Sequence, residues 1–274
     1  MSARAPSLCR LIRGYLEQEC ACGDFARLFI TRVPKAPGKS AAQQAATPAT
    51  AGKAPGNAEP APVLAAREPQ PAPYGQTAPE FTPPSGTKQA KLDALRAYIG
   101  NCPRCPILVR NRKKIVFGSG NPDASIVFVG EAPGQDEDIQ GLPFVGRAGQ
   151  VLTNIIEKGM AISRDQVYIA NILKCRPPNN REPLPDEMSH CTPFLNWQLA
   201  IIEPKVIVAL GGYAAHYLTG TQTGITKLRG TWHAYRDIPV MPTFHPAYLL
   251  RNYSQENRRL VWQDVQTVIE KTGS

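Results

Sequence analysis

The sequence has no apolar run that approaches the about 20 residues of a membrane-spanning helix, which excludes a membrane span. Its N-terminus also lacks a long apolar segment and carries acidic residues early, so we expect no secretory signal. Charged residues are scarce, at 19% of the 274 positions, whereas hydrophobic residues reach 42%, enough for one sizeable core. The 31 Lys and Arg residues outnumber the 22 Asp and Glu residues, and the resulting net charge of +9 suits a polyanionic partner.

Aromatic residues are nearly missing from residues 34–88, where Tyr74 and Phe81 are the only two among 12 prolines, 14 alanines and 5 glycines. Such a composition cannot bury enough apolar surface to offset the chain entropy lost on folding. We therefore predict a disordered Pro/Ala-rich linker over 34–88, between a short helical segment over 1–33 and a folded domain over 89–274. The first segment is too short to fold alone, and we interpret it as a docking peptide for a protein partner.

Short apolar runs alternate with helical patterns across 89–274. The runs cover 125–130, 167–171, 206–211 and 239–244, and the helical patterns cover 88–99, 147–158, 186–202, 212–219 and 255–271. Nearly continuous apolar runs of this length are typical of parallel strands that are buried on both faces. The alternation predicts a three-layer α/β domain with right-handed crossovers.

Each predicted strand is followed by a polar residue or by glycine. Glu131, Asn171, the pair Gly211–Gly212 and His245 stand at these four positions. Ligands of open α/β sheets bind at the edge where the carboxyl ends of the strands meet. The pattern alone therefore predicts that Glu131, Asn171 and His245 surround one site.

The seven cysteines are an odd number in a chain for which we expect no secretion, so a metal or cluster site is a better interpretation than a disulfide framework. Four of them lie in the predicted domain. Cys102 and Cys105 form a CxxC hairpin, and Cys175 and Cys191 are 16 residues apart. Four thiolates without a histidine pattern suit either Zn²⁺ or a [4Fe–4S] cluster, and the spacing does not separate the two.

Four motifs carry a resemblance to a known family: GEAPGQDED at 130–138, PFVGRAG at 143–149, NILKCRPPNNR at 171–181 and FHPAYLLR at 244–251. With the cysteine pattern, they resemble the family 4 (iron–sulfur) uracil-DNA glycosylases over about residues 89–271. The resemblance implies an α/β/α uracil-DNA glycosylase-like fold with a central four-stranded parallel sheet. It also implies a [4Fe–4S] cluster on Cys102, Cys105, Cys175 and Cys191. The implied activity is hydrolysis of the N-glycosidic bond of uracil in DNA, which initiates base excision repair.

The chemistry of that reaction suggests a role for each motif residue. A uracil extruded from DNA presents N3–H as a donor and O4 as an acceptor, which the amide of Asn171 matches, while Phe144 would stack on its ring. Cleavage produces a uracil anion and a cationic sugar, so we expect His245 to donate to O2 and Glu131 to orient or deprotonate the water. Glu137 is our candidate for excluding the methyl group of thymine. The other substrate-binding residues that we predict are Gly130, Ala132, Gly134 and Asp136.

Binding to DNA calls for a side chain that fills the gap left by the extruded base. We predict Leu249 or Leu250 as this wedge, Arg251 as a phosphate contact and the basic run Arg110–Lys114 as a further contact with the backbone. The expected substrate is uracil-containing DNA, single- or double-stranded. We expect a cytoplasmic monomer with prokaryotic, nucleoid-associated use.

Two other function classes compete with this hypothesis. One is a non-catalytic iron–sulfur module that binds damaged DNA, and the other is a zinc-stabilised nucleotide-binding protein. Residues 223–235 contain His233 but no basic insert, which favours hydrolysis over covalent capture of DNA. No positioned lysine nucleophile is evident, so we predict a monofunctional glycosylase without a lyase step.

Overall fold

The computed structural model describes residues 80–273 and contains one mixed sheet with the strand order β1-β3-β2-β4-β6-β5. The four central strands are parallel and correspond to the four predicted runs: β3 (Tyr168–Asn171), β2 (Ile126–Gly130), β4 (Val206–Leu210) and β6 (Ile238–Thr243). Two antiparallel edge strands, β1 (Ser119–Gly120) and β5 (His233–Tyr235), extend the sheet to six. The predicted parallel core is confirmed, but the expected total of four strands is wrong. The two edge strands are only two and three residues long and leave no apolar run in the sequence.

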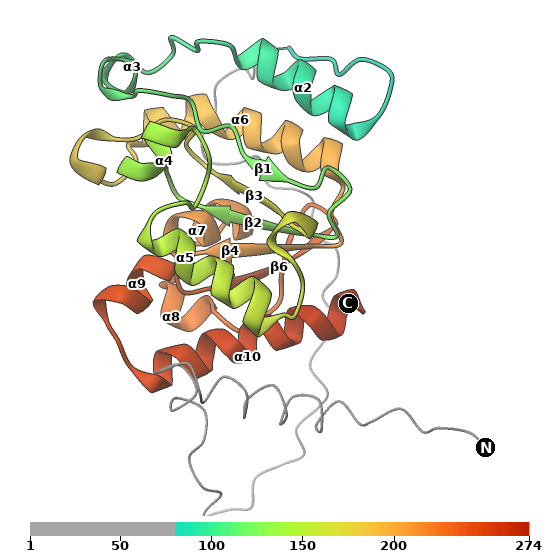
Figure 1. Ribbon diagram of the computed structural model, residues 1–274, viewed down its shortest axis with the longest axis vertical. Helices are drawn as coiled ribbons and strands as arrows, with labels where there is room; N and C mark the ends of the chain where they lie inside the picture. The colour runs from blue at the N-terminus through green and yellow to red at the C-terminus, as the bar shows by residue number, and fades with distance from the viewer. Residues whose placement is uncertain (1–79, 274) are drawn as a thin grey trace, which may run out of the picture. The chain divides into compact units, whose positions relative to one another are not determined.

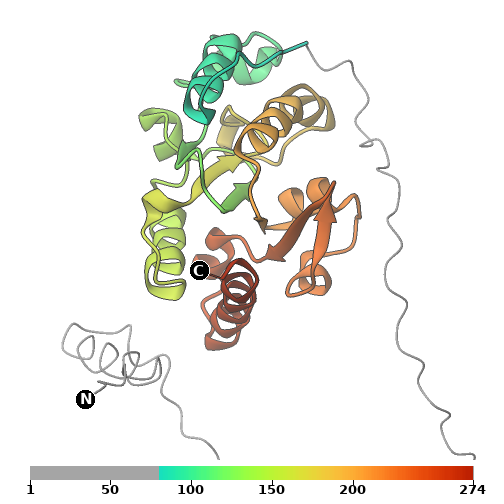
Figure 2. The same ribbon diagram turned by 90° about the vertical axis from the view of Figure 1, so that its right-hand side faces the viewer.

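Helices cover both faces of this sheet, as the three-layer prediction requires (Figures 1 and 2). Val127 and Val129 of β2 point into a core shared with α2 (Lys88–Ile99), α6 (Pro185–Ile202) and α7 (Gly212–Thr219). Ile126 and Phe128 point to the opposite core, shared with α5 (Arg147–Asn154) and α10 (Gln255–Thr272). Every residue of β2 is buried, which explains why its apolar run is continuous rather than alternating.

Several short elements at the strand ends had no recognisable pattern in the sequence. They are α3 (Pro106–Asn111), α4 (Gln135–Gln140), α8 (Ile225–Leu228) and α9 (Pro246–Arg251), together with the 3₁₀ turns Arg164–Gln166 and Pro178–Asn180. A helix of four to six residues spans fewer than two turns, so its hydrophobic spacing is not measurable. In addition, α5 continues as a π-helical turn over Ile155–Gly159, which completes the predicted helix over 147–158.

The described chain makes ordered contacts a few residues earlier than predicted. The Phe81 ring lies 5.2 Å from the ring of Tyr98 and 5.3 Å from that of Trp197, measured between centroids. Thr87 caps α2, because its hydroxyl accepts a hydrogen bond from the amide of Ala90 at 3.2 Å. The segment predicted over 1–33 and the linker up to residue 79 lie outside the described residues, so this division of the chain stays a prediction.

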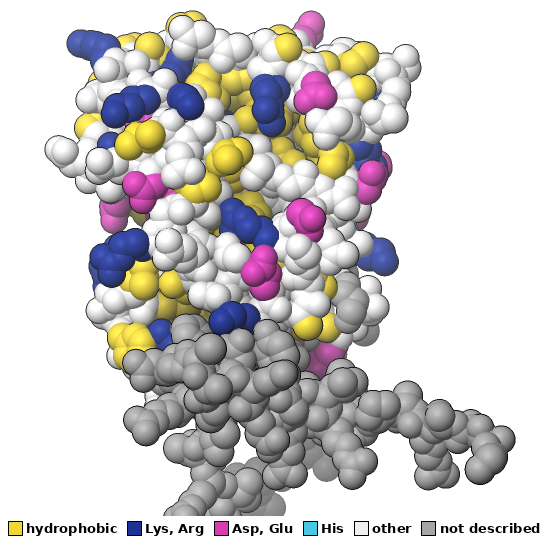
Figure 3. Space-filling model, viewed as in Figure 1, with side chains coloured by type: hydrophobic (Ala, Val, Ile, Leu, Met, Phe, Trp, Pro, Cys, Tyr) yellow, Lys and Arg dark blue, Asp and Glu magenta, His cyan; other side chains and the backbone are white. Residues whose placement is uncertain are grey.

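Within residues 80–273, no helix is both long and apolar enough to cross a membrane. On the face shown in Figure 3, Lys and Arg side chains lie scattered among polar ones, and hydrophobic side chains gather in the upper half. A cavity between α2, the segment before β1 and the residues after α4 is lined by Arg96, Ile99, Phe117 and Leu142, among others.

Candidate active site and cysteine centre

The ends of β2 and β3 bring the first site residues together. Gly130 and Asn171 are paired in the parallel register of these strands. Asn171 is 2% exposed, and its Oδ1 is a buried atom that has no hydrogen-bond partner among the described residues. This oxygen lies directly against the Cα of Gly130. Since buried polar atoms in native proteins are nearly always paired, Asn171 Oδ1 is an acceptor placed for an external donor.

Phe144 links this amide to the other side of the site. A Cβ added at Gly130 would lie 2.6 Å from Cζ of Phe144, so the ring rests on the glycine beside Asn171. On its other side, the ring centroid lies 5.6 Å from that of His245, with an angle of 35° between the two planes. Phe144 has a φ of 51°, a left-handed conformation that is costly for a residue with a side chain. The surrounding structure must therefore hold it in place.

Arg164 and Glu137 hold the Phe144 loop through its backbone. The Arg164 guanidinium donates to the carbonyls of Pro143 at 2.9 Å and Phe144 at 3.0 Å. Glu137 Oε1 accepts from the amides of Val145 and Gly146, both at 2.9 Å. Arg164 was missed in the sequence because a single arginine in a 3₁₀ turn, 20 residues from Phe144, carries no signal. The contacts of Glu137 make it a residue that positions this loop, and its predicted exclusion of thymine stays a prediction.

His245 is the N-cap residue of α9, and this role fixes its tautomer. Its Nδ1 accepts a hydrogen bond from the amide of Ala247 at 3.1 Å, so the ring proton belongs on Nε2. Burial lowers the pKa of His245 to about 4, with a further decrease from Arg251 and an opposing effect of Glu137. The imidazole is therefore neutral at pH 7 and has one N–H to donate. Gly211, at a φ of 90°, allows this approach, since a Cβ there would lie 3.0 Å from Cβ of His245.

Glu131 follows Gly130 directly and is half-buried. Burial raises its pKa to about 7, the negative charge of Glu182 raises it further, and Arg251 opposes the shift. Its backbone carbonyl accepts from the amide of Leu173 at 3.0 Å, which ties it to the segment after β3. A carboxyl group with a pKa near neutrality can take up and release a proton at physiological pH, as a general base must.

The other predicted substrate residues lie on or near α4. Ala132 packs against the core formed with α2, α6 and α7, and Gly134 donates its amide to Glu137 Oε2 at 3.1 Å. The Asp136 carboxylate lies against Gly146 at the exposed side of the same loop. Gly134 and Asp136 are therefore connected to the loop that carries Phe144, through Glu137 and Gly146.

The two candidate wedge leucines occupy different environments. Leu249 is 5% exposed and packs with Phe244 and Val261, whereas Leu250 is 39% exposed. Arg251 is exposed as well. Because Leu249 is part of a core, only Leu250 retains the accessibility that a wedge needs.

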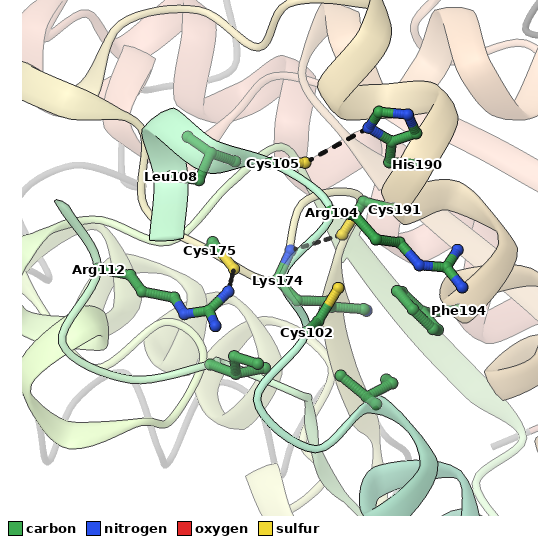
Figure 4. A pocket seen from close by; sticks show the side chains of 12 residues that line it. Cys102, Arg104, Cys105, Leu108, Arg112, Lys174, Cys175, His190, Cys191 and Phe194 are labelled. Atoms are coloured by element: carbon green, nitrogen blue, oxygen red, sulfur yellow. Dashed lines mark hydrogen bonds between the residues drawn. The ribbon is translucent and has the colours of Figure 1, made fainter. Parts of the chain in front are cut away.

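The four predicted cysteine ligands line a single cavity between α3, α6 and the segment that follows β3 (Figure 4). Arg112 Nη1 donates to Cys175 Sγ at 3.1 Å, and the amide of Lys174 donates to Cys191 Sγ at 3.2 Å. This contact directs the Arg112 guanidinium toward the cysteines, and its expected use on the DNA backbone stays a prediction. Within residues 80–273, no three His, Cys, Asp or Glu side chains are grouped closely enough to hold a metal ion.

Lys174 lies at the border between the cysteines and the strand ends. Its side chain is 1% exposed, and its Nζ donates to the carbonyl of Asn171 at 2.8 Å and to Gln198 Oε1 at 2.6 Å. Burial lowers its pKa to about 8, while Cys191 and Cys175, as thiolates, oppose that shift. Burial also raises the pKa of Cys191 to about 12, so the free thiol is protonated at pH 7, and a bound metal would displace that proton.

Comparison with known proteins identifies consistent relatives. The profile described as "Uracil DNA glycosylase superfamily" matches residues 117–266. A type-4 uracil-DNA glycosylase of Thermotoga maritima is 46% identical over 194 residues, which cover 68% of this chain and 99% of that protein. Type-4 enzymes of Saccharolobus solfataricus and Sulfurisphaera tokodaii are 42% and 41% identical, over 67% and 65% of this chain and 87% and 84% of their own lengths.

Proposed function

Since this chain belongs to the type-4 uracil-DNA glycosylases, we propose that it removes uracil from DNA through the site formed by Glu131, Phe144, Asn171 and His245. The reaction is hydrolysis of the N-glycosidic bond, and it opens base excision repair of the damaged strand. The substrate base must leave the DNA stack to reach these side chains.

The buried, unpartnered Oδ1 of Asn171 is the observation that carries the proposal. In uracil, N3–H is the donor that this oxygen lacks, and O4 is an acceptor for the amide NH₂. Cytosine presents an acceptor at N3 and a donor at C4, so both contacts would be lost. Each unpaired buried polar group costs about 1–3 kcal/mol, which is enough to reject cytosine. The Phe144 ring, which rests on Gly130 beside the amide, supplies the stacking surface.

His245 and Glu131 would share the chemistry of bond cleavage. The neutral imidazole holds its proton on Nε2, from which it can donate a hydrogen bond to uracil O2 as negative charge develops there. The Glu131 carboxylate would orient and deprotonate water, and its negative charge would stabilise the cationic sugar. No lysine is needed in this scheme, which is consistent with a monofunctional enzyme.

The exposed side chains of α9 would engage DNA. Leu250 would fill the space left by the extruded nucleotide, and Arg251 would contact a phosphate. Arg251 also lies near enough to Glu131 and His245 to lower the pKa of both. The helix therefore connects backbone binding with the reacting groups.

Cys102, Cys105, Cys175 and Cys191 would hold a [4Fe–4S] cluster. Their side chains line one cavity, and the resemblance to the type-4 enzymes, which implies this cluster, favours it over a single Zn²⁺. Hydrogen bonds from Arg112 and from the Lys174 amide to two of the sulfurs suit thiolate ligands. When bound, the cluster would cross-link residues 102–105 to α6 and the segment after β3. Iron and sulfide content of the purified protein tests this assignment.

The substitution Glu131→Gln tests the activity itself. It keeps the size of the side chain but removes the base, so we expect the rate of uracil release to fall by about 10²–10⁴-fold with DNA binding retained. Glu270→Gln, at an exposed carboxylate near the C-terminus, serves as the control and should leave the rate unchanged. Wild-type protein that binds uracil-containing DNA but releases no uracil would instead support the non-catalytic DNA-binding module.

A further inference from the structure

Lys174 presents an electrostatic problem that the proposed mechanism does not explain. Its ammonium is completely enclosed, and both acceptors of its hydrogen bonds, the Asn171 carbonyl and Gln198 Oε1, are neutral. None of the ion pairs within residues 80–273 includes Lys174. A buried charge is strongly destabilising unless an opposite charge lies close by.

The cysteines supply the missing charge. Lys174 lines the same cavity as all four cysteines, it directly precedes Cys175, and its backbone amide donates to Cys191 Sγ at 3.2 Å. Figure 4 shows Lys174 among these sulfurs, with its backbone amide directed at Cys191. A centre bound by four thiolates carries net negative charge and would compensate the ammonium.

The same side chain reaches the base-recognition residue. From Cys175, the chain runs back through Lys174, Leu173 and Ile172 to Asn171, and the Lys174 side chain folds over this segment onto the Asn171 carbonyl. The amides of Ile172 and Leu173 bond to the carbonyls of Gly130 and Glu131, both at 3.0 Å, which fixes the other side of the segment. Gln198, which is fully buried, anchors the ammonium through its own bond to the Phe117 carbonyl at 2.8 Å.

We propose that Lys174 is a positioning residue that couples the cysteine centre to uracil recognition. Its ammonium is compensated by the thiolate-bound centre and, in turn, fixes the backbone of Asn171 so that Oδ1 faces the base. This inference rests on the proposed function, because it assigns Asn171 to uracil and a cluster to the four cysteines. It predicts that removing the charge of Lys174 weakens both the retention of the cluster by the cysteines and the recognition of uracil by Asn171.

Lys174→Met, which keeps the length of the side chain without its charge, tests the coupling. The control is Lys88→Met, because Lys88 also donates to a backbone carbonyl, that of Ile202 at 2.6 Å, on the outside of the domain. For Lys174→Met, we expect release of iron to a chelator to accelerate. We also expect the KM for uracil-containing DNA, which does not depend on the fraction of iron-loaded protein, to rise about tenfold or more. Lys88→Met should change neither. If Lys174→Met is insoluble, Lys174→Gln, which keeps a donor but no charge, takes its place.

A double-mutant cycle with Asn171→Ala separates coupling from a general loss of structure. If Lys174 acts through Asn171, its substitution will not lower uracil release further in the Asn171→Ala background, although iron release will still accelerate. The inference would be overturned if Lys174→Met lowered uracil release by the same factor in the wild-type and the Asn171→Ala backgrounds. Unchanged iron release and KM in the single Lys174→Met variant would overturn it as well. Failure of the proposed function would look different: the wild-type protein would release no uracil, or Asn171→Ala would release it at the wild-type rate.

Discussion

The residues at the strand ends and those of α9 differ in their solvent exposure. Asn171 and Phe144 are 2% and 6% exposed, whereas Leu250 is 39% exposed and Arg251 also reaches the surface. Discrimination between bases requires polar groups of fixed geometry, which burial and a dense set of backbone hydrogen bonds provide. A wedge has to leave the protein surface and enter DNA, so it cannot belong to the core. The proposed function thus places base recognition and DNA capture in regions of opposite burial.

The largest effect that distinguishes the two regions should come from Gly130→Ala. The added methyl group would overlap the Phe144 ring and Asn171 Oδ1, so either the stacking surface or the amide must move. We expect kcat/KM for uracil release to fall about a hundredfold or more, because displacements of 1 Å in a preorganised site have effects of this size. Single-turnover kinetics would measure the fall, and affinity for undamaged DNA should not change.

Gly224→Ala is the matched control, since an added Cβ at that position meets no atom within 4 Å. A Gly130→Ala variant with wild-type activity would show that the strand-end region tolerates movement. The contrast between a rigid, buried strand-end region and an exposed α9 would then be wrong.

The pH dependence of kcat/KM tests the role of Glu131 in the strand-end region. In the proposed mechanism Glu131 acts as a carboxylate. Burial raises its pKa to about 7, so kcat/KM should fall about tenfold per pH unit below that value. His245 adds no second limb between pH 5 and 8, since its pKa is lowered to about 4 and it stays neutral there. Glu182→Gln removes a negative charge that raises the pKa of Glu131, so the limb should move to lower pH. A profile that is flat below pH 7 would exclude Glu131 as the base.

Arg164→Gln should have a smaller effect, because it acts only through the Phe144 loop. Without the two hydrogen bonds to the carbonyls of Pro143 and Phe144, the left-handed conformation of Phe144 loses part of its support. We expect KM to rise about tenfold with a smaller change in kcat. In the Phe144→Ala background the same substitution should have no further effect on KM, and an additive effect would show that Arg164 acts elsewhere.

The sequence predicted the central strands and the positions that follow them, because this signal is local. Each central strand is buried on both faces, so its apolar run and the polar residue after it could be identified directly, as with β2 and Glu131. Arg164 and Lys174 could not be assigned in this way. Arg164 contacts the Phe144 carbonyl, 20 residues away, and Lys174 is held by Gln198, 24 residues away, and only the fold brings these residues close. The edge strands, of two and three residues, were missed for lack of any pattern.

The choice between the two leucines shows the same limit in α9. Leu249 and Leu250 are neighbours of the same type, and α9 has only six residues, so the sequence does not reveal which face of the helix is buried. The packing of Leu249 against Phe244 and Val261 decides the question. In this region the structure, rather than the pattern, identifies the exposed leucine.

The same pair provides the mildest test of the comparison. Leu249→Ala leaves a cavity in the core and should lower the free energy of unfolding by about 2–5 kcal/mol. Leu250→Ala should change stability by less than about 0.5 kcal/mol, as an exposed substitution does. It should nevertheless slow uracil release from double-stranded DNA severalfold more than from single-stranded DNA, because only a duplex has a base stack to refill. Equal slowing on both substrates would remove Leu250 from the wedge role and leave α9 with backbone contacts alone.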